Sequence, residues 1–142
     1  MAVQSPFPVV FDQVFPLGLF AVGEVQPLND FKASSQEMKV QQRDRDTGLP
    51  IWVIDVMDPD PTAREHSFKV KIIADHPPVL PDLVPGVPFI PVVLDGVTVT
   101  PYLKELGRDE KTGEMRYKIA YSLRAAGLSA SRQRANESGK AA

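Results

Sequence analysis

The sequence contains no cysteine, two histidines and a single tryptophan. The absence of cysteine excludes disulfides, thiolate zinc sites and a cysteine nucleophile. The two histidines, His66 and His76, lie in a spacing unlike that of zinc motifs, and no HExxH sequence accompanies them. No apolar run approaches the roughly 20 residues that a membrane-spanning helix requires. We therefore expect a protein with no metal, no cofactor and no membrane association.

The chain also lacks the short motifs that mark common catalytic sites. There is no GxSxG turn, and the glycines around residues 17–25 fit neither GxGxxG nor GxxxxGK[ST]. Residues 1–11 have neither the basic start nor the long apolar run of a secretory signal. These absences predict a cytoplasmic protein that is not an enzyme.

Proline, in contrast, is abundant, and the 14 prolines exclude an all-helical fold because proline disrupts helix interiors. Between them, apolar residues alternate with polar residues in the pattern of half-buried strands. An Asp-Gly pair at residues 95–96 adds a hairpin or bulge signal. The predicted strands cover residues 17–25, 37–44, 50–58, 66–73, 91–103 (interrupted at the Asp-Gly pair) and 116–127.

This strand count predicts a mainly β fold with one domain over residues 1–128. A small OB-like barrel of five or six strands fits the length, and a β-sandwich is the alternative. Residues 129–142 contain no aromatic residue and no periodicity, so we expect a disordered C-terminal tail there.

Acidic residues flank the only tryptophan at short spacing and raise the alternatives of a metal site or of turns: Asp44, Asp46, Asp55, Asp58 and Asp60. A calcium loop needs a bidentate glutamate downstream, and the nearest, Glu65, lies beyond two prolines. Aspartate and glycine are common turn residues. The pattern favours turns at residues 43–48 and 58–61, with a buried strand between them and Trp52 in the core.

Charge is unevenly distributed along the chain. Residues 1–96 carry 7 basic and 13 acidic side chains, whereas residues 97–142 carry 9 and 5. Alternation places cations on the polar faces of the strands around residues 66–73 and 116–127, and Tyr102 and Phe89 are candidate surfaces for base stacking. The alternative is that these cations solvate exposed strands. The candidate nucleic-acid-binding residues are Lys69, Lys71, Tyr102, Lys104, Arg116, Lys118 and Arg124.

Four segments together resemble a known family: "FPVVFDQVFPLGLFAVGEVQPLNDF", "VQQRDRDTGLPIWVIDVMDPDP", "VTVTPYL" and "IAYSLRAAGL". The family is that of the plasmid replication, integration and excision activators of actinobacterial integrative conjugative elements and plasmids. The resemblance covers residues 7–128 and differs in a longer connection over residues 104–118. It implies a role in maintaining a mobile element, with no catalytic motif to carry over.

Three functions follow as hypotheses. The first is a non-enzymatic accessory protein that binds single-stranded DNA to support replication or transfer. The second is a transcriptional activator that binds duplex DNA, for which no helix-turn-helix pattern is present but a β-ribbon remains an option. The third is an adaptor that docks a replication initiator or a helicase. The sequence leaves the oligomeric state open, a homodimer included.

Overall fold

Eight strands and one helical turn make up the described part of the chain, which in this computed structural model comprises residues 4–30, 35, 38–82, 85–86 and 88–130. No helix among these residues is long and apolar enough to cross a bilayer. The elements in chain order are β1 (Phe7–Pro8), α1 (Phe11–Val14), β2 (Leu19–Pro27), β3 (Ile51–Met57), β4 (Ser67–Ile73), β5 (Ile90–Asp95), β6 (Thr98–Arg108), β7 (Met115–Ala125) and β8 (Gly127–Ala130).

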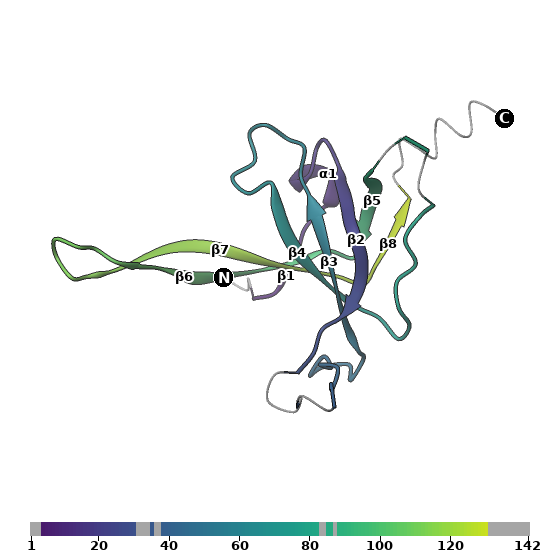
Figure 1. Ribbon diagram of the computed structural model, residues 1–142, viewed down its shortest axis with the longest axis horizontal. Coiled ribbons are helices and arrows are strands. Elements are labelled where there is room, and N and C mark those ends of the chain that lie inside the picture. The colour runs from purple at the N-terminus through teal and green to yellow at the C-terminus, as the bar shows by residue number, and fades with distance from the viewer. Residues whose placement is uncertain (1–3, 31–34, 36–37, 83–84, 87, 131–142) are drawn as a thin grey trace.

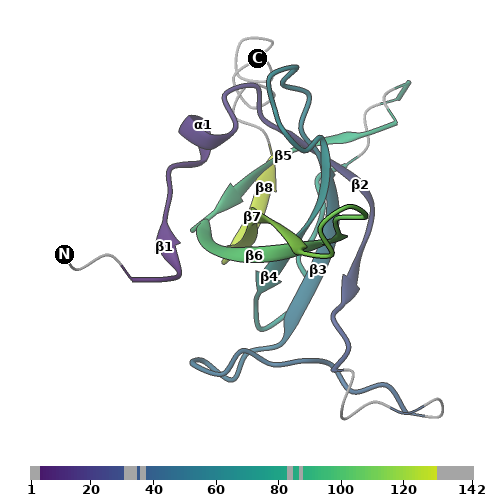
Figure 2. The same ribbon diagram turned by 90° about the vertical axis from the view of Figure 1, so that its left-hand side faces the viewer.

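All eight strands belong to one mixed sheet with the order β1-β6-β7-β4-β3-β2-β5-β8 (Figures 1 and 2). Neighbouring strands are antiparallel except β4 and β7, which run parallel. Among the described residues the end strands β1 and β8 do not pair, so the sheet is not closed into a barrel. The prediction of a mainly β chain is confirmed, but the sheet has eight strands instead of five or six and is open.

The core follows from the alternation in the central strands. In β3 and β4 the side chains of Ile54, Val56, Val70 and Ile72 are each at most 1% exposed. The intervening residues of β4 point to the opposite face, as period-two alternation requires. Buried side chains of β2, β5 and α1 join the same cluster, because the sheet curls around it (Figure 2).

Aromatic residues near the N-terminus cover one end of this core. Phe11 and Phe15 are buried, with ring centroids 5.3 Å apart. Phe15 also stacks on Phe68 of β4 at 6.0 Å. Offset aromatic contacts of this kind add stability beyond their burial, so α1 serves as a plug for the core.

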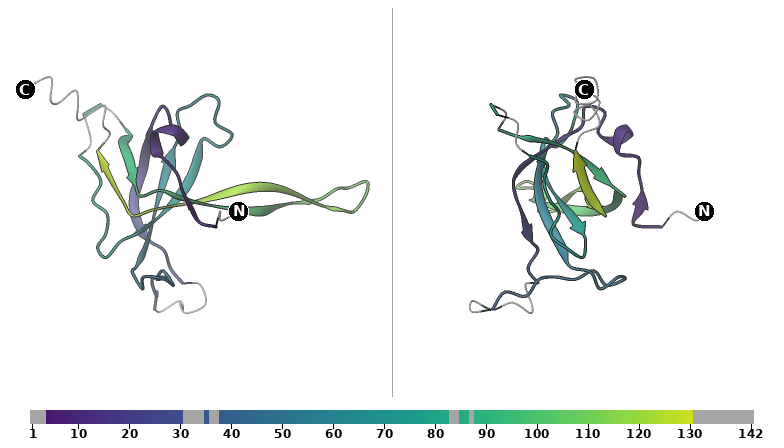
Figure 3. Two further views of the ribbon diagram at one scale, coloured as in Figure 1. Left: turned by 180° about the vertical axis from the view of Figure 1, so that it is seen from behind. Right: turned by 90° about the vertical axis from the view of Figure 1, so that its right-hand side faces the viewer.

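The β6–β7 hairpin extends well beyond the rest of the molecule (Figures 1 and 3). We call its projecting part, residues 101–121, the arm. At its tip, Asp109 and Glu114 close the turn through a 2.8 Å backbone hydrogen bond. A register shift between Glu105 and Gly107 makes a bulge, where Gly107 has φ of 104°, a value that suits glycine. Inside the arm, β6 and β7 pair only with each other.

Three features of the strand prediction differ from the structure. Of the strand expected at residues 37–44, residue 37 lies outside the described residues, and residues 38–44 form only isolated bridges at Gln41 and Arg43. The short strands β1 and β8 were not predicted, because two or four residues are too few to show alternation. In the expected tail, Ser129 and Ala130 belong to β8 and pair with β5, and residues 131–142 lie outside the described residues.

Candidate nucleic-acid interface

The register of three neighbouring strands brings the predicted cations together. Lys71 of β4 lies beside Arg124 of β7 in the parallel pair. Further out, Lys104 of β6 lies directly opposite Lys118 of β7. Because alternate residues of a strand share a face, these cations lie on one side of the sheet.

We call this side the cationic face. Its residues come from β4, β6 and β7 and are the seven predicted ones: Lys69, Lys71, Tyr102, Lys104, Arg116, Lys118 and Arg124. From Arg124 to Arg116 the strand rises by roughly 26 Å at about 3.3 Å per residue. This length suits several nucleotides of an extended single strand.

Carboxylates neutralise part of the cationic face. Three ion pairs lie on it or at its rim: Lys69 Nζ to Asp55 Oδ1 at 2.9 Å, Lys118 Nζ to Glu65 Oε1 at 3.5 Å, and Arg124 Nη1 to Asp44 Oδ1 at 3.3 Å. Within the described part of the chain, no ion pair involves Lys71, Lys104 or Arg116. These three cations are therefore available to an anion without displacing a carboxylate.

Lys71 occupies the most unfavourable position for a positive charge. Burial lowers the pKa of its amine below the ordinary value, and the neighbouring Arg124 guanidinium lowers that pKa further. Both effects disfavour the charged form. A bound phosphate would favour the charged amine, so this end of the cationic face is suited to an anion.

Of the two predicted stacking residues, only Tyr102 lies on the cationic face. Its side chain is 48% exposed and sits opposite Ala120, whose small side chain leaves the ring accessible. Phe89 precedes β5, which pairs with β2 and β8 and not with the arm. The expectation that both aromatics lie between the basic strands β4 and β7 is wrong, because these two strands are direct neighbours: β6, which carries Tyr102, lies beyond β7, and β5 lies beyond β2.

The acidic residues around Trp52 form turns. Asp44 accepts hydrogen bonds from the backbone N–H of Thr47 at 3.0 Å and from the Thr47 hydroxyl at 2.9 Å. Asp58 accepts one from the backbone N–H of Asp60 at 3.0 Å. Among the described residues, no group of three His, Asp or Glu side chains is close enough to hold a metal. Trp52 packs against the core and donates from Nε1 to the Ala74 carbonyl at 3.0 Å.

Asp44 should make stability depend on pH in the acidic range. The Thr47 hydroxyl, together with the Thr47 backbone N–H and Arg124, holds the pKa of this carboxyl below its ordinary value of 3.8. A depressed pKa in the folded state means that the stabilisation is present above pH 3.8 and is lost as the pH falls further. We expect Asp44→Asn to be less stable than the unsubstituted protein near pH 6 and the gap to shrink below pH 3.8. Urea unfolding across this range measures the gap, and a constant gap would contradict the assignment.

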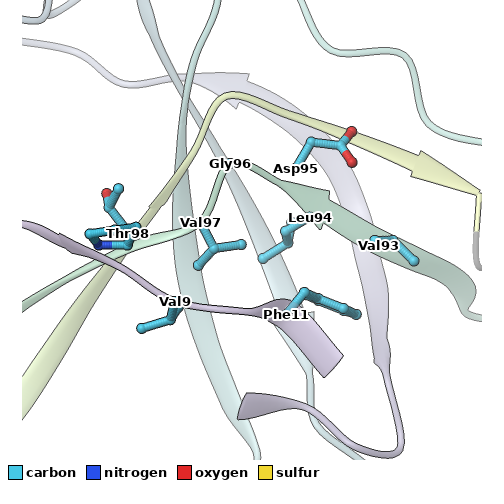
Figure 4. A pocket seen from close by; sticks show the side chains of 9 residues that line it. Val9, Phe11, Val93, Leu94, Asp95, Gly96, Val97 and Thr98 are labelled. Carbon is cyan, nitrogen blue, oxygen red and sulfur yellow. The ribbon is translucent and has the colours of Figure 1, made fainter. Parts of the chain in front are cut away.

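Two hollows lie near the arm. One, of about 630 Å³, opens at the base of the arm between its apolar side and the aromatic plug and is lined mainly by apolar side chains. The other, of about 390 Å³, lies between the N-terminal segment and the β5–β6 turn (Figure 4). Its walls include Val9, Phe11 and Leu94, and the Asp95 carboxylate points away from them (Figure 4). Four charged residues also line the larger hollow, Asp58, Arg64, Glu65 and Lys118, of which Lys118 pairs with Glu65.

The sequence does not predict that the side of the arm opposite the cationic face is exposed. Tyr117, Ile119 and Tyr121 are 53%, 61% and 57% exposed, because the arm projects beyond the body and no second layer covers it. Alternation shows which side chains share a face but not whether that face is covered. The feature that indicates the projection is strand length, since β6 and β7, with 11 residues each, are longer than the other strands of the sheet.

The cationic face combines amines, guanidinium groups and a phenol ring along an extended ribbon. Amines and guanidinium groups bind phosphates, and an exposed ring stacks on bases. Comparison of the chain with models of protein families, with curated proteins and with solved structures found no match.

Proposed function

We propose that this protein is a non-enzymatic accessory protein that binds single-stranded DNA through the cationic face of an OB-like sheet. The order of pairing supports the OB-like part of the proposal. β2 pairs with both β3 and β5, β3 pairs with β4, and β4 runs parallel to the inner end of β7. Ala126 alone separates β7 from β8, which pairs with β5. An OB fold is a partly open Greek-key barrel in which the third and fifth strands run parallel.

In this correspondence, β3 and β4 are the second and third OB strands, and the arm is an insertion between the fourth and the fifth. OB folds bind oligonucleotides on the face of the second and third strands and with the loops before the second and before the fifth. Lys69 and Lys71 lie on β4, and the remaining candidate residues lie on the arm or at its base. The predicted residues thus fall on the elements that OB folds use.

One observation carries the proposal: cations face cations on neighbouring strands. Lys71 lies beside Arg124, and Lys104 lies opposite Lys118. Like charges directly opposite one another destabilise a sheet, whereas a phosphate backbone between them would relieve the repulsion. Asp44 and Glu65 compensate one cation of each pair, Arg124 and Lys118, and the other cation, Lys71 or Lys104, is left for a polyanion.

The arrangement favours a single strand over a duplex. Tyr102 lies between the two cation pairs, so bases can stack on its ring while the cations follow the phosphates. The helix α1 has four residues and is too short to read a major groove. A two-stranded ribbon does fit a major groove, and the arm makes duplex binding the second candidate. Replication or transfer of a mobile element is the role that we propose on the resemblance described above.

Anisotropy of a labelled thymidine oligonucleotide tests the proposal. We expect binding at low ionic strength that weakens with salt, and Tyr102→Ala should cost about 1–3 kcal/mol, roughly 5- to 150-fold in affinity. Lys104→Gln and Arg116→Gln should each lower the slope of log affinity against log salt by about 0.7, the value for one phosphate contact on a single strand.

The matched control is Arg64→Gln, which removes one positive charge from the connection between β3 and β4, outside the three strands that carry the cationic face. We expect it to leave both affinity and salt slope nearly unchanged. Absence of oligonucleotide binding at low salt, or equal effects of Arg64→Gln and Lys104→Gln, would overturn the proposal. A duplex competitor that displaces the single strand at lower concentration would favour the second candidate.

A further inference from the structure

The side of the arm opposite the cationic face is an unpartnered apolar surface. We call it the apolar face; its cross-strand pairs are Pro101–Tyr121, Leu103–Ile119 and Glu105–Tyr117. Leu103 is 69% exposed, and its partner Ile119 is 61% exposed. Half-exposed aromatic and aliphatic side chains in such a row present roughly 400 Å² of apolar surface. An exposed apolar patch of this area is commonly an interaction site.

An isolated two-stranded ribbon also needs a covering layer for its stability. Two-stranded hairpins are marginally stable in water unless an apolar face packs against another element. In the described part of the chain, no element lies over the apolar face beyond the base of the arm (Figures 1 and 2). Something that packs on this face would therefore hold the arm in the extended form that the cationic face requires.

The charges of the apolar face do not suit nucleic acid. Its three cross-strand pairs contain one charged residue, Glu105, whose carboxylate repels phosphate. At the tip, the guanidinium of Arg108 donates to the Gly113 carbonyl at 3.0 Å and is held in the turn. The cations are on the opposite side, so the two sides of the arm fit different partners.

We propose that the apolar face is a homodimer interface in which two arms pack antiparallel, face to face. A two-fold axis that crosses the strands at the Leu103–Ile119 pair makes the surface its own complement. The axis sets the Glu105–Tyr117 pair of each arm against the Pro101–Tyr121 pair of the other. Each carboxylate then faces a chain region that offers a phenol hydroxyl, and the two carboxylates stay four residues apart, roughly 13 Å along the strand.

The cavity at the base of the arm supports this arrangement. Four residues outward from the axis on β7 is Met115, and four residues inward is Leu123, which lines the cavity of about 630 Å³. The antiparallel arrangement therefore carries Met115 of each protomer to the mouth of the other's cavity. That cavity is lined mainly by apolar side chains, Phe15 and Phe68 among them, with four charged residues also in its wall. The flexible methionine side chain suits irregular apolar gaps.

The dimer can be tested with the full chain and no DNA. Sedimentation at tens of micromolar should give twice the monomer mass of 15.6 kDa. Ile119→Asp places a carboxylate at the axis and should yield a monomer, whereas Lys104→Gln on the cationic face should remain a dimer. Circular dichroism and Trp52 fluorescence show that each variant is folded, which we expect because both side chains are exposed.

Cross-linking locates the interface independently of mass. The chain has no cysteine, so a single engineered one is the only reactive thiol. Leu103→Cys should be joined into a covalent dimer by a bismaleimide that spans about 10 Å, the spacing of packed sheets. Lys104→Cys is the adjacent residue on the opposite side and should not be joined.

Three results would overturn the proposal. They are a monomeric unsubstituted protein at these concentrations, cross-linking of Lys104→Cys as efficient as that of Leu103→Cys, and an unchanged dimer for Ile119→Asp. If the protein is a monomer and Ile119→Asp weakens oligonucleotide binding as much as Lys104→Gln does, the apolar face belongs to the nucleic-acid site instead.

Discussion

Replacement of residues 103–119 by Asn-Gly should strongly weaken oligonucleotide binding and leave the body of the protein folded. The change removes Lys104, Arg116 and Lys118 together, and an Asn-Gly pair is a favourable two-residue hairpin turn between Tyr102 and Ala120. Three lost charge-assisted contacts at about 1 kcal/mol each correspond to roughly 100-fold or more in affinity at low salt. Anisotropy of the labelled oligonucleotide measures the loss.

The same variant tests whether the arm is separable from the core. The removed side chains are exposed apart from half-buried Asp109 and Met115, so the free energy of unfolding should change by less than about 1 kcal/mol. A double variant, Lys104→Gln with Arg116→Gln, is the matched control because it keeps the arm and removes two of its charges. Retention of full affinity by the shortened chain would show that β4 and the β2–β3 connection bind the oligonucleotide without the arm.

Val70→Ala should lower the free energy of unfolding far more than the same substitution at an exposed valine. Val70 is 0% exposed in the middle of β4, and it pairs with Ile54 of β3. Loss of its two buried methyl groups, with the cavity left behind, should cost about 2–3 kcal/mol, a large share of the stability of a typical domain. Urea unfolding followed by Trp52 fluorescence measures this cost, since the indole packs against the same core.

The control for this change is Val79→Ala, which removes the same two methyl groups from a side chain that is 84% exposed. We expect its effect to stay within about 0.5 kcal/mol. Equal destabilisation by the two substitutions would contradict the placement of β4 at the centre of the core. Measurement of oligonucleotide affinity for both folded proteins should show no change, because neither side chain lies on the cationic face.

The central strands could be predicted from the sequence because their two faces differ. In β4, Phe68, Val70 and Ile72 alternate with Lys69 and Lys71, and this contrast fixes both the strand and the side that faces the core. The short strands β1 and β8 carry no such contrast. Their positions depend on pairing with β6 and β5, which only the folded chain provides.

The candidate site could be predicted in its residues but not in its shape. Alternation identified the cations of β4 and β7, and the parallel pair then placed Lys71 beside Arg124. The arm was missed, because the same alternation describes a strand that is covered on one side and a strand that projects into solvent. The ion pair between Arg124 and Asp44 was also missed, since the two residues are 80 positions apart in the sequence.

The single-residue link at Ala126 has a consequence for the order of folding. The β6–β7 hairpin consists of contacts close in the sequence, so we expect it to form early. When residues 123–125 then pair with β4, the single-residue link places β8 next to β5 in the same folding step. One stretch of chain thus closes both sides of the core at once, and the body is expected to fold and unfold as a single cooperative unit.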